Sequence, residues 1–421
     1  MPVFLFFTKT DSKFALPQNL MEMSGTESIF DAIRPYFDSE IPASISRMKA
    51  YEHIDDIADF LKIGGGGDTL RSILSECRTV DDFQDKIMAM VVEHIISSTS
   101  AGVEFTGLKH FDGGRKHLIL ANHRDIVLDP AIIQLILHRN DVSTTEIAVG
   151  DNLITSRFIE DVCRSNKMIK VTRSSSPREV YMSSMLLSKY IRCQVASQTS
   201  SIWIAQRNGR TKDGHDMTEQ GLLKMVQMSG SGDFYSDMCE LDILPTAISY
   251  EFEPCDALKT KELFISRRHH YVKKEGEDLN SILTGISSWK GRIRICFTKP
   301  ILPSDIASCA ALAKNERFVE LGRIIDRQIH AAYYLWPNNY IAEDLLSERE
   351  GKASGLSRKY SKAAKETFLI HMQEQLDAIE GDIRGEQGLD LGDNMRSELE
   401  EIFLGIYANP VRSRSEAEIK A

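Results

Sequence analysis

The chain has 421 residues, of which 42% are hydrophobic and 27% charged, the composition of an ordinary soluble globular protein. Its formal net charge of −10 argues against non-specific binding to nucleic acid. No apolar run approaches the ~20 residues of a transmembrane helix, and the first residues lack the features of a secretory signal. The seven cysteines, an odd number without paired spacing, are typical of reduced thiols. We therefore expect a cytoplasmic protein whose contact with the inner membrane face is at most peripheral.

Residues 1–100 are expected to form an N-terminal helical region. Thr79 and Asp82 have the spacing of a helix-capping pair, and the apolar residues that follow repeat at helical intervals. Four consecutive glycines at 64–67 interrupt this pattern. No strand precedes them and no Lys-Ser/Thr pair follows, so a turn between two helices is favoured over a phosphate-binding loop.

Residues 101–302 have a different texture, in which short apolar runs alternate with segments of helical length. Such alternation predicts an α/β domain with a mixed or parallel sheet wrapped by helices. Ligands of these sheets bind beyond the ends of the strands, so the loops after the strands matter most. The expected strands cover residues 116–121, 146–150, 168–172, 200–205, 243–250 and 292–297.

Residues 303–421 are expected to form a C-terminal helical extension, in which the last two helices are separated by a glycine-containing linker at 380–394. Three apolar stripes at helical spacing could grip acyl chains or a membrane, but packing onto a core is the commoner reason for such a face. The stripes comprise Phe318, Leu321, Ile325 and Ile329, then Phe368, Met372, Leu376 and Ile379, and finally Met395, Leu399, Ile402, Phe403 and Ile406.

The stretch at 116–137 carries the clearest chemical pattern. An apolar run is followed by a polar loop containing His123, and then by Asp129 and Pro130 at the start of a second apolar stretch. Asp at a helix N-cap followed by Pro at the first helical position is a strong helix start. A histidine and an aspartate thus share a strand-to-helix loop, as a general base and its orienting carboxylate require.

Blander interpretations exist, because a loop histidine often bonds a neighbour and an aspartate often only caps a helix. A protein kinase loop also contains His-Arg-Asp, but it needs an asparagine where this chain has Pro130. A metal site could be composed from His117, His123, Asp125 and Asp129. Their spacing matches no familiar metal motif, so we expect no metal.

The sequence around His123 resembles the His-x-x-x-x-Asp motif of the glycerolipid acyltransferases, the glycerol-3-phosphate and 1-acylglycerol-3-phosphate O-acyltransferases. Its Asp-Pro-Ala-Ile-Ile continuation looks especially like the soluble, plastid-type enzymes. Five residues rather than four separate His123 from Asp129, so the chain looks like a bacterial-like member with a variant His-x5-Asp motif. The resemblance implies that His123 is the catalytic base and Asp129 its partner. Asp125 becomes the partner if the loop is already helical.

Residues 202–212 look like a second block of the same family, Glu-Gly-x-Arg-Ser-Arg, in which a strand runs into a phosphate-binding loop. Arg207 and Asn208 stand where the family has Glu and Gly, and Arg210 and Lys212 keep its two cations. The resemblance assigns substrate binding to Arg207, Asn208, Gly209, Arg210 and Lys212. The alternative is a solvated basic turn.

Three further blocks follow the family order. Residues 168–173 resemble a block with Arg173 at its basic end, which adds Arg173 to the predicted phosphate contacts. Residues 243–250 and 290–301 resemble the later strands. A basic run at 264–274 is either a solvated face or a dock for acyl carrier protein or the phosphates of coenzyme A.

These resemblances imply a fold like that of glycerol-3-phosphate acyltransferase. They also imply transfer of a fatty acyl group from acyl-CoA or acyl carrier protein to glycerol 3-phosphate or 1-acylglycerol 3-phosphate in phospholipid biosynthesis. No metal or other cofactor is implied, because the thioester donor and the phosphorylated glycerol or lysolipid acceptor are both substrates. The alternatives are acyl transfer to another lipid acceptor, or a non-catalytic lipid- or acyl-carrier-binding protein on the same fold.

Overall fold

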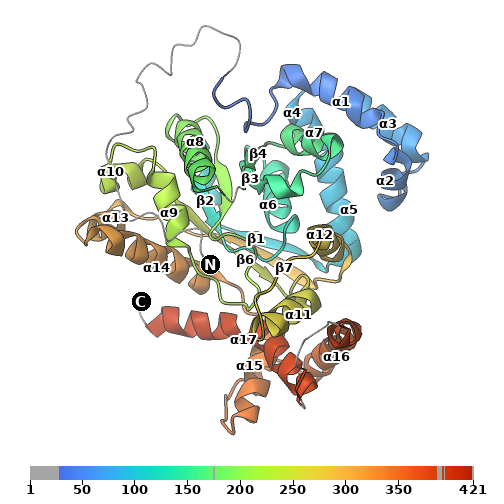
Figure 1. The fold of residues 1–421 in the computed structure, drawn as a ribbon, viewed down its shortest axis with the longest axis vertical. Helices are drawn as coiled ribbons and strands as arrows, with labels where there is room; N and C mark the ends of the chain where they lie inside the picture. Colours follow the sequence, from blue (N-terminus) through green and yellow to red (C-terminus); the bar gives the residue numbers. More distant parts are fainter. Residues whose placement is uncertain (1–27, 174–175, 386–390, 393, 420–421) are drawn as a thin grey trace.

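The computed structural model describes residues 28–173, 176–385, 391–392 and 394–419. In this part of the chain a seven-stranded mixed sheet is wrapped by helices (Figure 1). The predicted fold class is therefore confirmed. No helix among the described residues has both the length and the apolar character needed to span a membrane.

The sheet has the strand order β1-β7-β6-β2-β5-β3-β4. Only β7 runs antiparallel to a neighbour, β6, and every other neighbouring pair is parallel. Parallel pairing brings the carboxyl ends of β2, β3, β4, β5 and β6 to one edge of the sheet. The strands are β1 (Gly102–Thr106), β2 (Leu118–Ala121), β3 (Glu146–Gly150), β4 (Met168–Val171), β5 (Ile202–Ala205), β6 (Leu244–Tyr250) and β7 (Arg292–Phe297).

All six strands expected from the sequence are present, with boundaries within two residues of the prediction. The missed strand, β1, lies at the sheet edge, and three of its five residues are exposed. An exposed edge strand has no reason to form an apolar run, which explains why the sequence pattern did not reveal it.

Both faces of the sheet are covered, because the side chains of each strand alternate between two apolar cores. Leu118 and Leu120 of β2 belong to the core on one face, whereas Ile119 and Ala121 belong to the core on the other. The surrounding helices are α6 (Leu128–Arg139), α7 (Arg157–Ser165), α8 (Pro177–Ala196), α9 (Gln220–Gln227), α10 (Phe234–Cys239), α11 (Asp256–Ser266) and α12 (Glu277–Ser287). Short turns at η4 (Leu108–Gly114) and η5 (Asp151–Leu153) complete this part.

The N-terminal helices pack around an apolar core of their own and lie at the upper right in Figure 1. As predicted, Thr79 caps a helix by accepting a hydrogen bond from the Asp82 N–H at 3.0 Å. Gly64 and Gly65 lie in the turn between two helices, as predicted, whereas Gly66 and Gly67 are the first residues of the second helix. The elements are η2 (Asp38–Glu40), α1 (Ile41–Lys49), α2 (Ile54–Phe60), α3 (Gly66–Glu76), α4 (Val80–Phe83), the π-helical η3 (Gln84–Ala89) and α5 (Met90–Thr99).

The three C-terminal apolar stripes are buried, so packing rather than exposure explains them. The predicted start of the linker at residue 380, however, is too early. Helix α16 continues to Arg384 because Ile383 is buried in the C-terminal core, and Gly381 is tolerated inside the helix. The elements are α13 (Pro303–Ala310), α14 (Lys314–Ala332), α15 (Pro337–Arg349), η6 (Ser357–Lys359), α16 (Lys362–Arg384) and α17 (Met395–Ile419).

Glu146 at the start of β3 places a carboxyl group inside the protein, where the Tyr190 hydroxyl donates a hydrogen bond to it at 2.7 Å. Burial raises the pKa of Glu146 from 4.5 to about 7, although the Tyr190 hydrogen bond opposes this change. Because the folded pKa lies above the unfolded one, the group favours folding at low pH. That contribution is lost as the pH rises through about 7.

We therefore expect Glu146→Gln to raise the free energy of unfolding at pH 8 by up to about 3 kcal/mol, since each pH unit of pKa difference corresponds to about 1.4 kcal/mol. This gain in the free energy of unfolding should disappear below about pH 4.5, where the wild-type Glu146 carboxyl is neutral in both the folded and the unfolded state. Urea unfolding between pH 4 and 8 measures this. Glu316→Gln, at an exposed position on α14, is the control and should show no such trend. A pH-independent difference for Glu146→Gln would contradict the assignment.

Candidate active site

His123 and Asp129 meet at the carboxyl edge of the central strand β2. The His123 Nδ1 lies 2.9 Å from the Asp129 Oδ2, and the histidine side chain is 14% exposed while that of Asp129 is fully buried. The pair that the sequence motif predicted is therefore formed in spite of the longer spacing. The ring remains partly accessible to a substrate, whereas its partner is shielded from water.

Asp129 is surrounded by hydrogen-bond donors. Its Oδ2 accepts from His123 and also from the backbone N–H groups of Arg124 and Asp125, at 2.6 and 3.0 Å. Its Oδ1 accepts from the Tyr250 hydroxyl at 2.8 Å. Two backbone N–H groups aimed at one oxygen favour an ionised carboxylate, and such a carboxylate pairs with a His123 that is protonated on Nδ1. The lone pair of the imidazole is then on Nε2, where a base needs it.

The predicted capping role of Asp129 is wrong, because α6 begins at Leu128 and Asp129 and Pro130 are its second and third residues. Asp125 holds this helix start instead, since its Oδ1 accepts from the backbone N–H groups of Val127 and Leu128 at 2.9 and 2.8 Å. The extra residue of the motif thus lies in a turn before the helix. This turn lets Asp129, rather than Asp125, reach the imidazole, as the sequence predicted.

Trp203 of β5 packs edge-on against the His123 ring, with the ring centroids 5.9 Å apart and the planes at 74°. The tryptophan is only 3% exposed. Its indole therefore limits how far the imidazole can turn away from Asp129. The sequence analysis placed Trp203 in an expected strand and in the 202–212 block. Its contact with His123 arises because β5 pairs directly with β2, a tertiary arrangement that the residue pattern did not indicate.

The loop after β5 is joined directly to the loop of His123. The backbone N–H of Thr211 donates to the His123 carbonyl at 2.7 Å. This bond follows from the parallel pairing of β2 with β5, because adjacent parallel strands release their loops side by side. Arg210 and Lys212, the two cations of the predicted phosphate-binding block, flank the bonded Thr211.

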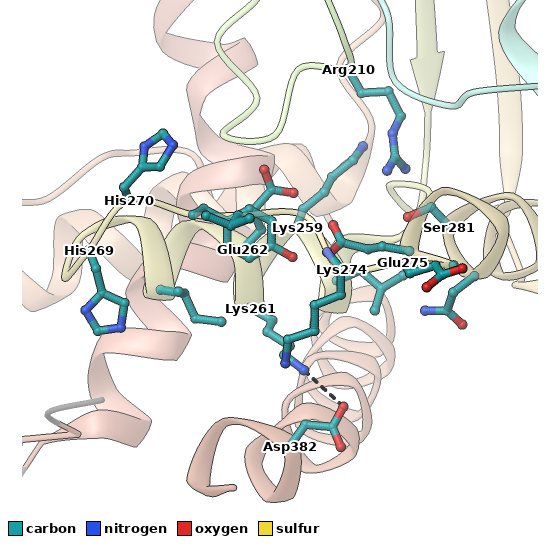
Figure 2. A pocket seen from close by; sticks show the side chains of 17 residues that line it. Arg210, Lys259, Lys261, Glu262, His269, His270, Lys274, Glu275, Ser281 and Asp382 are labelled. Atoms are coloured by element: carbon teal, nitrogen blue, oxygen red, sulfur yellow. Dashed lines mark hydrogen bonds and ion pairs between the residues drawn. The ribbon is translucent and has the colours of Figure 1, made fainter. Parts of the chain in front are cut away.

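Arg210 and Lys212 differ in their surroundings. The Arg210 Nη1 is buried and has no hydrogen-bond partner within the described part of the chain. Its side chain points into a cavity of about 460 Å³ (Figure 2). Lys212, in contrast, forms an ion pair with Glu262 of α11. Arg210 is thus the more available cation, and Glu262, 50 residues further along the chain, could not be paired with Lys212 from the sequence.

The other residues of this block shape the loop. Gly209 adopts a positive φ of 77°, a conformation that glycine reaches without strain. Asn208 is exposed, and its backbone N–H donates to the Glu219 Oε2 at 3.2 Å. The Arg207 Nε is buried and lacks a partner among the described residues. The roles predicted for Arg207, Asn208 and Gly209 in binding substrate stay predictions.

Arg173 follows the edge strand β4, and two strands, β3 and β5, separate it from β2. Its backbone N–H donates to the Asp151 Oδ1 at 3.1 Å, and its guanidinium lies over Gly150 so closely that a Cβ there would collide with it. In the described residues no hydrogen bond or ion pair joins Arg173 to His123 or Arg210. Its predicted contact with phosphate stays a prediction.

A network of buried ion pairs supports the loop that carries His123. The Arg124 guanidinium donates to Asp216 at 2.6 Å and to Glu253 at 3.3 Å. The Lys259 ammonium donates to Glu253 at 2.6 Å and to the Arg124 carbonyl at 2.8 Å. All four side chains are at most 3% exposed. The two cations and two anions balance, and the Lys259 bond to the Arg124 carbonyl holds the backbone that follows His123. Sequence reasoning missed this network because its members are scattered along the chain.

The C-terminal helix α17 also contacts this network. The Tyr407 hydroxyl accepts from the Glu253 backbone N–H at 2.9 Å and donates to the Asp256 Oδ2 at 2.7 Å. Gly214, with a φ of 80°, lies against the Ile406 carbonyl, where any Cβ would collide. The helical extension is therefore part of the scaffold that holds the His123 loop.

His117 and His123 lie at opposite ends of β2, which removes the basis for a shared metal site. The His117 ring nitrogens face the carbonyl oxygens of Asp242 and His110, at 3.2 and 2.9 Å. Among the residues that the structure describes, no group of three or more His, Cys, Asp or Glu side chains is placed to hold a metal ion.

Residues 102–249 match the family model described as Acyltransferase. The matched segment runs from the start of β1 almost to the end of β6, and it contains His123, Asp129 and Arg210. Together with the His123–Asp129 geometry, the match supports the acyltransferase family, which is the coarser part of the resemblance seen in the sequence.

Among solved structures, the chain is similar to the 1-acyl-sn-glycerophosphate (LPA) acyltransferase PlsC from Thermotoga maritima. The two share 12% sequence identity with a TM-score of 0.37, over 69% of this chain and 91% of the other. No curated protein matches the chain.

Proposed function

We propose that this acyltransferase-type protein moves a fatty acyl group from acyl-CoA or acyl carrier protein to a hydroxyl of a phosphorylated glycerol acceptor, either glycerol 3-phosphate or 1-acylglycerol 3-phosphate. The observation that carries the proposal is the His123–Asp129 pair, formed at 2.9 Å inside the segment that matches the acyltransferase family. The proposed setting is phospholipid biosynthesis in the cytoplasm, with peripheral contact to the membrane.

A hydroxyl is a poor nucleophile at neutral pH, so the reaction needs a base. In the proposed mechanism, His123 Nε2 accepts the hydroxyl proton while the hydroxyl oxygen attacks the thioester carbonyl carbon. Asp129 stabilises the imidazolium that forms. The tetrahedral intermediate then breaks its C–S bond, and the departing thiolate takes the proton from His123. The acceptor supplies the nucleophile, so no acyl-enzyme is required.

The direct test incubates the purified protein with radiolabelled acyl-CoA or acyl carrier protein and each acceptor, and separates the lipids by chromatography. A labelled ester that depends on both substrates is the expected result. A non-catalytic lipid- or acyl-carrier-binding protein would retain the thioester and form no ester. Absence of product with every donor and acceptor pair would reject the proposal.

Arg210 is proposed to bind the acceptor phosphate, because its buried Nη1 lacks a partner among the described residues and its loop is bonded to that of His123. Removing a charge-assisted hydrogen bond typically costs ~1.5–3 kcal/mol, which corresponds to roughly 10- to 150-fold in affinity. We expect Arg210→Ala to raise the KM for the acceptor by this factor. The KM for the donor should change much less.

Initial rates measured at varied acceptor and varied donor concentrations separate the two effects. Arg358→Ala, at an exposed position on η6, is the matched control and should change neither KM. An increase confined to the donor would instead place Arg210 in the thioester site.

A further inference from the structure

The cavity beside Arg210 lies mostly outside the segment that matches the acyltransferase family. Its walls come from α11, from the loop at 267–276 and from α12, and Asp382 of α16 closes one side (Figure 2). At about 460 Å³ it falls within the ~300–1,000 Å³ range of small-molecule sites. Among the described residues of the segment 102–249, only Arg210 lines it.

The charges around this cavity are balanced. Four lysine or arginine side chains and four carboxylates line it: Arg210, Lys259, Lys261, Lys274, Glu262, Glu275, Glu277 and Asp382. A site for a phosphate group alone needs an excess of cations, because each nearby carboxylate repels the ligand. A balanced lining fits a ligand that carries both a negative and a positive group.

Several of these charges already neutralise one another. Lys261 pairs with Asp382 at 3.2 Å, Lys259 pairs with the buried Glu253, and Glu262 pairs with Lys212. On the cationic side, Arg210 keeps a buried Nη1 that lacks a partner among the described residues.

On the acidic side, Glu277 accepts only the backbone N–H of Lys274, at 3.1 Å, among the contacts of the described residues. Glu275 is exposed at the cavity wall. The three ion pairs leave the Arg210 guanidinium, the Lys274 ammonium and the carboxylates of Glu275 and Glu277 outside them.

Glu277 and Arg210 both line the cavity. Burial lowers the pKa of Lys212, as does Arg210, and the Glu277 carboxylate opposes both effects, so its charge is felt at this loop. Two residue contacts lead from the cavity towards the catalytic loop. Ser281, on the cavity wall, accepts a hydrogen bond from the Cys255 thiol through its carbonyl, and Gly285, one turn further along α12, lies against the Asp125 side chain.

We propose that this cavity binds the headgroup of an amine-bearing lysophospholipid, with Arg210 on the phosphodiester and Glu277, assisted by Glu275, on the ammonium group. The assignment rests on the proposed acyl transfer and extends its acceptors to zwitterionic lysolipids. In a headgroup such as phosphoethanolamine the two charges are separated by a two-carbon link, which matches neighbouring cationic and acidic groups. The several phosphates of coenzyme A fit less well, because four carboxylates line the cavity.

Binding of two soluble headgroup probes tests the assignment without any need for catalysis. Isothermal titration calorimetry of the full chain compares glycerophosphoethanolamine with glycerol 3-phosphate. We expect Glu277→Gln to weaken the binding of glycerophosphoethanolamine about 3- to 10-fold, the scale of a partly exposed charge pair. The same substitution should strengthen the binding of glycerol 3-phosphate. Glutamine can still accept the Lys274 N–H, so the loop is retained. Glu316→Gln is the matched control on α14 and should change neither value.

Kinetics with lysophosphatidylethanolamine and lysophosphatidate provide the second readout. The double variant Glu275→Gln/Glu277→Gln should raise the KM for the first acceptor and lower it for the second, because the lost carboxylates attract an ammonium and repel a phosphomonoester. Equal changes for both acceptors, or a change confined to the donor KM, would overturn the headgroup assignment.

The two proposals fail separately. Selective binding of glycerophosphoethanolamine without ester formation would reject the proposed function and keep the headgroup site. Ester formation by a protein that does not bind glycerophosphoethanolamine would reject the headgroup site alone.

Discussion

His123→Ala is expected to lower the kcat of acyl transfer by about 10²- to 10⁴-fold, the usual contribution of a positioned general base. The Asp129 carboxylate orients the imidazole, and the imidazole side chain is 14% exposed, so a substrate hydroxyl can reach it. Substrate affinity should change little, because the phosphate contact is assigned to Arg210. The measurement is kcat at saturating concentrations of donor and acceptor, calculated from the concentration of active protein.

The fold should survive this substitution, because the loop is also held by the Arg124 and Asp125 backbone bonds to Asp129. Circular dichroism and thermal unfolding check this point. His53→Ala, at an exposed position before α2, is the control and should retain wild-type kcat. Near wild-type turnover by a folded His123→Ala variant would remove His123 from the mechanism.

The fold was predictable where burial imposes a pattern on the sequence. The four residues of β2 and the seven of β6 are buried; a continuous apolar run marked β2, and a largely apolar run that includes Thr246 and Ser249 marked β6. The exposed edge strand β1 had no such pattern. The end of α16 was misplaced for a different reason, since Gly381 suggested a linker whereas burial of Ile383 extends the helix.

The candidate site was predictable only as far as its residues are close together in sequence. His123 and Asp129 belong to one motif, and their contact formed as expected. The exchange of capping roles between Asp125 and Asp129 depends on where the turn before α6 closes, which no residue pattern specifies. The neutralisation of Lys212 depends on α11 packing beside the loop, a tertiary contact that no local rule contains.

The buried ionic network was likewise not predictable, although one of its members, Arg124, lies inside the His123 motif. Arg124 is a basic residue directly beside His123, yet its side chain is fully buried and faces Asp216 and Glu253. These partners lie 92 and 129 residues away in sequence. A basic residue in a catalytic loop can therefore serve the structure of that loop rather than its substrate.

Arg124→Met is expected to lower the free energy of unfolding by about 3–5 kcal/mol, the usual cost of removing one partner from a buried ion pair. The substitution leaves Asp216 and Glu253 with Lys259 as the remaining cation of the network. One buried negative charge is then uncompensated. Chemical denaturation at pH 7, followed by circular dichroism, measures the loss.

A second substitution distinguishes this charge effect from simple loss of packing. Asp216→Asn in the Arg124→Met background restores the neutrality of the network. The asparagine oxygen can still accept the hydrogen bond that the Asn122 side-chain amide donates to Asp216 at 3.0 Å. We expect the double variant to be more stable than Arg124→Met alone, because the uncompensated charge is gone, and a double-mutant cycle measures this coupling. If packing dominates instead, the two losses will add and the double variant will be the least stable. A loss below about 1 kcal/mol for Arg124→Met would be a typical surface-pair value and would contradict a buried network beneath the His123 loop.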